Sequence, residues 1–236
     1  MDPDRFEPAL HALFDEFPVS PNPNGRRFTR ILDEVPGLAC ENNLALLNLA
    51  ASMLEPGESY VEVGSLRGTS VIAAMVGNDD ADFVAIDDFS MKDASRKELE
   101  HNIAHFGLEL PTIVEGDAFQ VIPSGALAGK SVGVYYYDAG HSYEQQIDGL
   151  RMIEPWLADR ALLIVDDTDW EQVEQATRDY LEGQPKARLL VWIPGKDNGY
   201  PHWWEGVKVL AWESDAGALP EPAARAAAVV ELGVDR

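Results

Sequence analysis

The chain has 236 residues, 46% of them hydrophobic, and a formal net charge of −23. This length and apolar content predict one sizeable core in a single domain with a modest appendage. The strong negative charge repels phosphate backbones and anionic lipid surfaces, which excludes nucleic acid and membranes as expected partners. The single cysteine, Cys40, excludes intrachain disulfides and thiolate zinc clusters, and we interpret it as an inert thiol.

The N-terminal residues contain no basic region followed by an apolar run, and no apolar stretch approaches the roughly 18 residues of a membrane span. We therefore expect a soluble cytoplasmic protein that acts on a small-molecule substrate, and leave a homo-oligomer open. Residues 1–41 are rich in proline and polar groups. They predict an irregular N-terminal segment with one or two short helices, which we treat as a candidate lid.

From residue 42 onward, helices and strands are expected to alternate. Apolar residues at helical spacing predict helices at 42–54, 69–76, 95–107, 143–157 and 170–183. Short apolar runs predict strands at 60–64, 82–88, 111–117, 131–138, 161–167, 187–193 and 206–212. The alternation indicates an α/β fold with a doubly wound, mostly parallel seven-stranded sheet. The last two strands have no helix between them, so we expect an antiparallel pair at one edge.

Carboxylates follow five successive predicted strands near the point where each strand ends. They are Glu62, Asp87, Asp88, Asp117, Asp138, Asp166 and Asp167. In an open α/β sheet, ligands bind outside the carboxyl ends of the strands. A single acid there is often only the cap of the next helix. Burying an unpaired carboxylate costs several kcal/mol, so we interpret the whole row as the lining of a site for a shared polar ligand.

A glycine turn follows the first strand in the sequence "EVGSLRG", residues 62–68. The dinucleotide fingerprint G-x-G-x-x-G has a glycine where Leu66 stands here, and the Gly-Lys-Ser/Thr of a P-loop is absent. The turn of Gly64, Ser65 and Gly68 therefore fits a ligand that carries no phosphate but needs close backbone approach. We expect Glu62 to hold an ammonium group of that ligand, directly or through water.

The acids after the next two strands suit a nucleoside. Asp87, with Asp88 beside it, is placed to accept hydrogen bonds from ribose hydroxyls. Asp117, followed by Ala118, is placed to accept from an adenine amine. A nicotinamide-dependent oxidoreductase is the competing enzyme class, and the missing middle glycine of the fingerprint argues against it.

Four motifs in order now resemble the class I S-adenosylmethionine-dependent methyltransferases: "VEVGSLRGTS", "VAIDD", "VEGDAF" and "YYYDAGHSYEQQ". The resemblance covers roughly residues 42–212 and implies a Rossmann-like methyltransferase domain, which we place at 42–215 with a C-terminal tail at 216–236. The fourth motif, with "LLIVDD" after it, is similar to small-molecule O-methyltransferases that carry Asp-x-x-His-Ser/Thr-Tyr. One departure is "LADRALL" (157–163), which replaces the usual glycines before the fifth strand; we expect only a turn to differ.

The resemblance implies a donor site at Glu62, Gly64, Ser65, Gly68, Asp87, Asp88, Asp117, Ala118 and Asp138. It also implies a metal site, because the metal-dependent relatives use carboxylates at the ends of the fourth and fifth strands. Asp138, Asp166 and Asp167 are the candidate ligands, and their hard oxygen atoms suit Mg²⁺ or Ca²⁺. The alternative is that Asp166 and Asp167 only cap the following helix.

His141 stands three residues beyond Asp138, at the expected mouth of the pocket. With Asp138 it forms the candidate catalytic pair, in which the imidazole accepts the proton of a substrate hydroxyl. The alternative is a capping or supporting histidine. The aromatic loop "NGYPHWWEG" (198–206) is a candidate for recognition of a sugar ring or polycyclic substrate, or else packs at the sheet edge.

Together these observations predict an S-adenosylmethionine-dependent O-methyltransferase that acts on a hydroxyl of a sugar or secondary metabolite, assisted by a divalent metal. A metal-independent N- or C-methyltransferase and a non-catalytic adenosyl-binding protein remain alternatives, because one fold hosts many functions.

Overall fold

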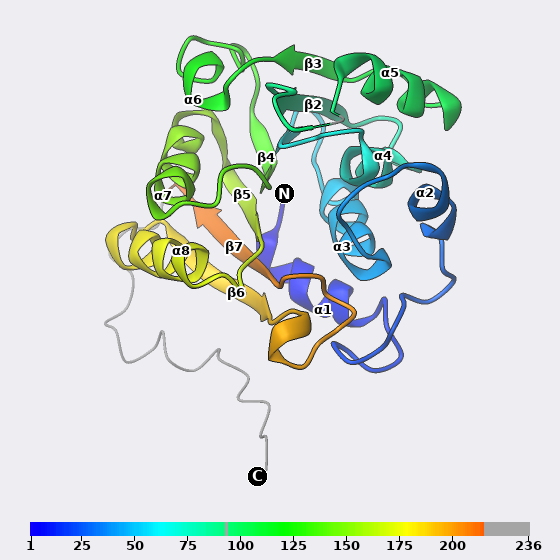
Figure 1. Cartoon of the computed structure of the whole chain (residues 1–236). Helices are drawn as coiled ribbons and strands as arrows, with labels where there is room; N and C mark the ends of the chain where they lie inside the picture. Colours follow the sequence, from blue (N-terminus) through cyan, green and yellow to red (C-terminus); the bar gives the residue numbers. More distant parts are fainter. Residues whose placement is uncertain (93, 215–236) are drawn as a thin grey trace.

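The computed structural model describes residues 1–92 and 94–214, so the predicted tail at 216–236 lies outside the described residues. A single twisted sheet runs through the centre, and helices cover both of its faces (Figure 1). The strands are β1 (Ser59–Val63), β2 (Asp82–Asp87), β3 (Thr112–Glu115), β4 (Val132–Tyr137), β5 (Leu157–Asp166), β6 (Ala187–Ile193) and β7 (Val207–Glu213).

The strand order is β3-β2-β1-β4-β5-β7-β6. The pairs β1–β2, β1–β4, β2–β3 and β4–β5 are parallel, whereas β7 pairs antiparallel with both β5 and β6. The order reverses at β1 and β4, which is the switch point where α/β sheets bind ligands. The predicted seven-stranded, mostly parallel sheet with an antiparallel edge pair is confirmed.

The helices divide between the two faces. One face carries α1 (Phe6–His11), α2 (Thr29–Glu34), α3 (Glu41–Ser52), α4 (Thr69–Met75) and α5 (Arg96–His105); the other carries α6 (Ala118–Val121), α7 (Tyr143–Met152) and α8 (Glu171–Gly183). Three single 3-10 turns complete the set: Pro3–Arg5, Glu154–Trp156 and Lys196–Asn198. Among the described residues, none of these helices has both the length and the apolar character needed to cross a lipid bilayer.

Each face of the sheet has its own hydrophobic core. On β4, Tyr136 is buried in the core beneath α3 and α4, whereas Tyr135 and Tyr137 are buried in the core beneath α7 and α8. Successive strand residues point to opposite faces, so a run of three tyrosines supplies both cores. The same alternation governs the acids that follow the strands.

The N-terminal segment forms the short helices expected of it and packs into the first of these cores. Phe6, Leu10 and Phe28 are buried in the same cluster as the sheet residues. Of this segment, the stretch 37–39 reaches the cavity described below. The domain boundary at residue 41 and the lid role stay predictions, but α1 and α2 are built into the core rather than laid over the site.

One expected helix is shorter than predicted. The sequence favours a helix over 143–157, but α7 ends at Met152, and Pro155 lies in the 3-10 turn that follows. Proline lacks the N–H that a continuing helix needs. β5 begins at Leu157, so the stretch "LADRALL" (157–163) lies within the strand, whereas a turn before the strand is expected from the sequence.

Candidate functional site

A cavity of about 530 Å³ opens at the carboxyl ends of β1 to β5. It is lined by nine of the predicted site residues: Gly64, Ser65, Asp87, Asp88, Asp117, Ala118, Asp138, His141 and Asp167. Five of the seven acids in the strand-end row therefore converge on one pocket. Glu62, Gly68 and Asp166 are not among the lining residues.

The two glycines of the first turn are explained by contacts inside the protein. Both have positive φ, +96° at Gly64 and +98° at Gly68. A Cβ on Gly64 would lie 1.7 Å from the carbonyl oxygen of Asp138, so only glycine lets the turn after β1 meet the turn after β4. A Cβ on Gly68 would lie 2.7 Å from the Leu99 side chain on α5. The turn thus fixes the relative position of the two strand ends that border the pocket.

Glu62 lies behind the pocket wall. Its side chain is fully buried and accepts hydrogen bonds from Tyr60 Oη at 2.9 Å and Ser70 Oγ at 2.8 Å. Burial raises its pKa to about 7, although these two hydroxyl donors oppose the shift. Ser70 does line the cavity. Any effect of the Glu62 charge on a ligand would therefore pass through Ser70 rather than through direct contact.

Asp87 is held in a fixed orientation at the edge of the cavity. The backbone N–H of Leu66 donates to its Oδ2 at 2.7 Å, and the N–H of Phe89 donates to its Oδ1 at 2.6 Å. Both of these residues have positive φ, +48° and +52°, which is uncommon for large side chains. The carboxylate thus secures two strained turns and presents its remaining lone pairs to the cavity.

Asp88 and Asp117, at the same end of the cavity as Asp87, also accept hydrogen bonds from nearby backbone amides. Asp88 is exposed and accepts from the N–H of Ser90 at 2.8 Å, and this hydrogen bonding lowers its pKa. Asp117 caps α6, because its Oδ1 accepts from the N–H of Phe119 at 3.0 Å. Asp117 is both a helix cap and a cavity-lining residue, so the two interpretations of its carboxylate are compatible.

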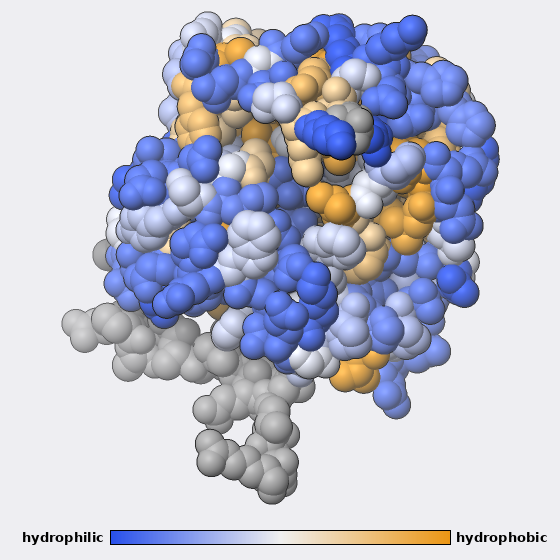
Figure 2. Space-filling model, viewed as in Figure 1, coloured by the Kyte–Doolittle hydropathy of each residue, from blue (hydrophilic) through white to orange (hydrophobic). Residues whose placement is uncertain are grey.

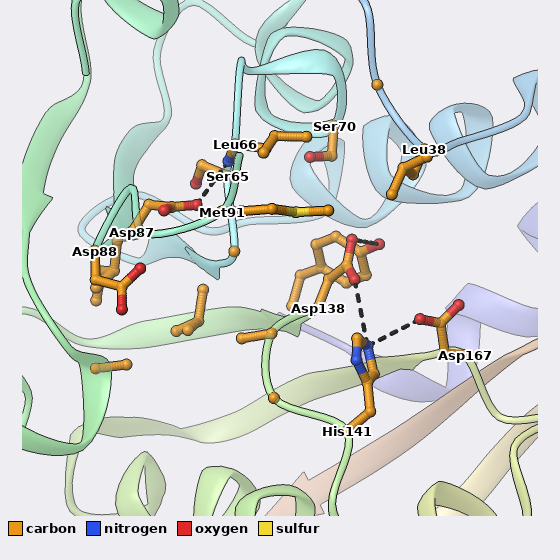
Figure 3. A pocket seen from close by; sticks show the side chains of 18 of the residues that line it. Leu38, Ser65, Leu66, Ser70, Asp87, Asp88, Met91, Asp138, His141 and Asp167 are labelled. Carbon is orange, nitrogen blue, oxygen red and sulfur yellow. Dashed lines mark hydrogen bonds and ion pairs between the residues drawn. The ribbon is translucent and has the colours of Figure 1, made fainter. Parts of the chain in front are cut away.

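The opposite end of the cavity holds Asp138, His141 and Asp167 (Figure 3). His141 Nε2 lies 2.8 Å from Asp167 Oδ2 and 3.9 Å from Asp138 Oδ1. One ligand atom from each residue lies within 4.8 Å of the other two. Asp167 has φ +55°, a left-handed conformation that turns its side chain away from the direction of β5. Two segments, the loop between β4 and α7 and the turn after β5, thus meet at one point.

Within the described part of the chain, these three side chains accept no backbone hydrogen bonds like those of Asp87 and Asp117; Asp138 Oδ2 accepts from Tyr136 Oη at 3.1 Å, and His141 pairs with Asp167. His141 Nε2 is buried and meets Asp167 Oδ2, whereas the other oxygen of Asp167, Oδ1, is buried without a hydrogen-bond partner among the described residues. Burial, followed by the charges of Asp166 and Asp167, raises the pKa of Asp138 well above its ordinary value. Buried polar atoms normally have partners, so this group is incomplete as it stands. Two carboxylates and an imidazole form a donor set that fits a divalent cation.

Asp166 differs from its predicted place in the metal site. It is almost fully buried, and its Oδ2 accepts from Tyr136 Oη at 2.7 Å while its Oδ1 faces Asn43 Nδ2 at 3.4 Å. Burial raises its pKa to about 7. It lies on the α3 side of the sheet, because β5 directs successive side chains to opposite faces. The group that the structure gathers is Asp138, His141 and Asp167, with the histidine in the place expected for Asp166.

Sequence reasoning missed several residues of this site. Asn43 lines the cavity from α3, where a polar residue at a buried helical position was the available signal. Trp170 places its ring 4.8 Å from the His141 ring. In the aromatic loop, Trp204 lines the cavity, but Trp203 is fully buried and donates from Nε1 to the Pro18 carbonyl at 2.7 Å. For Trp203, the packing interpretation is therefore the correct one.

Comparison of the sequence with known protein families identifies one family that is consistent with the geometry of this site. Residues 61–168 match the model of a family described as a methyltransferase domain. Over this segment the chain is similar to methyltransferase domains. The match spans β1 to the end of β5, which is the part of the chain that supplies most of the cavity, and it confirms the predicted enzyme class. No curated protein matches the chain in sequence.

Solved structures share the fold. Cofactor-bound Rv0187 from MTB is 18% identical with a TM-score of 0.60, over 91% of this chain and 98% of that chain. The O-methyltransferase TomG from Streptomyces achromogenes, described in complex with SAM, is 18% identical with a TM-score of 0.59, over 91% of each chain. An O-methyltransferase from Bacillus cereus in complex with SAH is 14% identical with a TM-score of 0.59, over 81% and 92%. At these identities the similarity shows the fold.

Proposed function

We propose that the protein transfers the methyl group of S-adenosylmethionine to a hydroxyl oxygen of a small molecule, with a divalent cation at the acceptor end of the cavity. The observation that carries this proposal is one continuous cavity with two different ends. Asp87 and Asp117 line one end, and Asp138, His141 and Asp167 converge at the other. A positively charged sulfonium between two sets of carboxylates is favoured electrostatically.

At the donor end, Asp87 would accept from the ribose hydroxyls, because its carboxylate is already oriented by two backbone amides. Asp117 would accept from the adenine amine beside Ala118. The turn of Gly64 and Ser65 would face the methionine part of the donor. The binding of SAM and SAH by proteins of the same fold supports this assignment.

At the acceptor end, methyl transfer is an in-line displacement that needs an ionised oxygen held close to the sulfonium methyl. Asp138, His141 and Asp167 would hold a divalent cation, which when bound supplies the charge that lowers the pKa of a hydroxyl. An imidazole in the set favours Mn²⁺ or a later transition metal over Ca²⁺. Without the cation, Asp167 Oδ2 lies 2.8 Å from His141 Nε2 and keeps the two side chains together, and Tyr136 Oη, 3.1 Å from Asp138 Oδ2, orients Asp138.

Calorimetry separates the parts of this proposal. S-adenosylhomocysteine should bind to the full chain with one site, whereas NAD should not. Mn²⁺ and Mg²⁺ should be titrated into chelator-treated protein with S-adenosylhomocysteine already bound. Tight binding of NAD without binding of S-adenosylhomocysteine would contradict the donor assignment and favour an oxidoreductase.

Chelation tests the cation separately once a substrate is found. Activity should be lost in chelator and restored by the metal. Full activity in chelator would show that no cation takes part in the reaction. His141, positioned by Asp167, would then be the base that accepts the hydroxyl proton.

A further inference from the structure

Two large apolar side chains are exposed at the mouth of the cavity. Leu38 is 54% exposed and Met91 is 56% exposed, and both line the cavity. They come from different parts of the chain, the stretch between α2 and α3 and the loop after β2. Figure 3 shows the Met91 side chain extending across the cavity toward Leu38, above Asp138. Apolar groups that remain exposed at the rim of a pocket commonly mark a surface that contacts a ligand.

The indole of Trp204 is a third apolar group of this cavity. Figure 2 shows that apolar residues interrupt the otherwise hydrophilic surface on this face of the molecule. Two exposed apolar side chains and an indole in the lining offer dispersion contact and few hydrogen bonds. Such a rim suits the faces of a ring compound better than the hydroxyl-covered surface of a sugar.

The charges that line the cavity are of one sign. Five carboxylates line it, and no lysine or arginine is among its described lining residues: Asp87, Asp88, Asp117, Asp138, Asp167. Lys196 lies nearby, with Nζ 5.2 Å from the centre of the Trp204 ring, but it is already paired with the Glu205 carboxylate. An anionic acceptor would therefore find no ready cationic side chain in the described lining.

A bound divalent cation and the net positive charge of the donor would neutralise part of this negative charge but not all of it. A carboxylate or phosphate at the rim would lose its hydration and meet no cationic side chain of the described lining, which is unfavourable. It would also be repelled by the remaining acids at distances where such repulsion is worth about 1–2 kcal/mol. The cavity thus selects its acceptor by charge as well as by shape.

We propose that the methyl acceptor is an uncharged ring compound, held between Leu38 and Met91 with its hydroxyl directed toward Asp138, and that carboxylated or phosphorylated acceptors are rejected. This inference rests on the proposed function, because it concerns the acceptor of the same reaction. It adds two properties of the acceptor, the absence of a negative charge and an apolar character, and both follow from the residues at the rim and in the lining of this cavity.

The first experiment uses matched acceptors that differ only in charge. Protocatechuate and its carboxamide have nearly the same shape, and glucose serves as an uncharged polar ring. With saturating S-adenosylmethionine and Mn²⁺, the carboxamide should have a kcat/KM at least about tenfold above that of the carboxylate. Equal or better use of the carboxylate, or methylation of glucose in preference to the carboxamide, would overturn the inference.

The second experiment changes the rim. Met91→Lys places a cation at the exposed mouth and should raise the relative use of protocatechuate several-fold. Met91→Gln has a similar length without the charge and should leave the preference unchanged. An identical preference in the two variants would show that rim charge does not select the acceptor, and would overturn the inference.

Binding of S-adenosylhomocysteine, measured by calorimetry in every variant, separates the two levels of failure. If it binds and neither the carboxamide nor the carboxylate is bound or methylated, the acceptor inference is wrong while the donor assignment stands. If it does not bind to the unmodified protein, the proposed function itself fails.

Discussion

The donor end and the acceptor end of the cavity are built on opposite principles. At the donor end, Asp87 accepts hydrogen bonds from the backbone amides of Phe89 in its own turn and of Leu66 in the turn after β1, and Asp117 accepts from the amide of Phe119. At the acceptor end, His141 Nε2 and Asp167 Oδ1 are buried without such partners. The Asp87 and Asp117 carboxylates are oriented before any ligand binds, whereas at the acceptor end Asp167 Oδ1 is buried without a partner among the described residues, a cost that a ligand or ion would offset.

This difference indicates where each kind of change should act. Substitutions at the donor end should weaken donor binding and leave the chemical step intact. Substitutions at the acceptor end should slow methyl transfer and leave donor affinity intact. Four predictions test this separation, taken from the largest expected effect to the smallest.

Asp167→Asn should lower kcat by roughly a hundredfold or more, because it removes a charge that either holds the cation or orients His141. Asparagine tolerates the positive φ of this position, so the fold should persist. Affinity for S-adenosylhomocysteine by calorimetry should change little. A loss of donor affinity as large as the loss of kcat would show that the two ends are not separate.

The free energy of unfolding should depend on pH through the titration of Glu62, the buried acid behind the donor end. The pKa of Glu62 is raised to about 7 from an ordinary 4.5, so the folded chain binds this proton more tightly than the unfolded chain. Its contribution to the free energy of unfolding is therefore fully present below about pH 4.5 and is lost as the pH rises to about 7, by roughly 2–3 kcal/mol. Asp166, with its pKa raised to about 7, acts in the same direction.

Glu62→Gln should flatten this dependence. Urea unfolding at about pH 5 and pH 8 should show a smaller loss of stability in the variant than in the unmodified protein. Equal losses in the two proteins would mean that Glu62 does not carry the effect.

Asp87→Asn should weaken S-adenosylhomocysteine binding by about tenfold or more. The amide cannot accept from both Leu66 and Phe89, so the turns and the ribose contact are disturbed together. At saturating donor, kcat should stay within about twofold. Asp88→Asn is the matched control, because Asp88 is the exposed neighbour, and it should change donor affinity less.

Tyr136→Phe should have the smallest effect, a several-fold fall in kcat with unchanged donor affinity. Its hydroxyl lies 2.7 Å from Asp166 Oδ2 and 3.1 Å from Asp138 Oδ2, so its loss frees Asp138 to move and costs about 1–2 kcal/mol of stability. Tyr135→Phe is the matched control on the other face, where the lost hydrogen bond goes to the Gly149 carbonyl. A fall in kcat of the same size in the control would assign the effect of Tyr136 to stability alone.

The sequence by itself determined the sheet and the location of the site. Apolar runs alternating with helical spacing predict β1 to β7, and parallel strands end at one edge, so their acids had to meet there. Asp117 was the most predictable acid of the donor end, because it acts within its own turn, whereas Asp87 also bonds to Leu66 in the turn after β1. Residues at the rim could not be found in this way, since Leu38 and Met91 carry no motif.

Only the tertiary structure decided which side chains face the cavity. Asp166 and Asp167 are adjacent and chemically identical, yet one bonds to Tyr136 on the α3 side and the other meets His141. Trp203 and Trp204 divide in the same way, one buried in the core and one in the cavity. Asp167 and Trp204 both have a positive φ, so each side chain leaves the backbone in a direction different from that of the residue before it. That direction is set by where each strand ends and by turns such as the left-handed one at Asp167, which depend on contacts between segments far apart in the sequence.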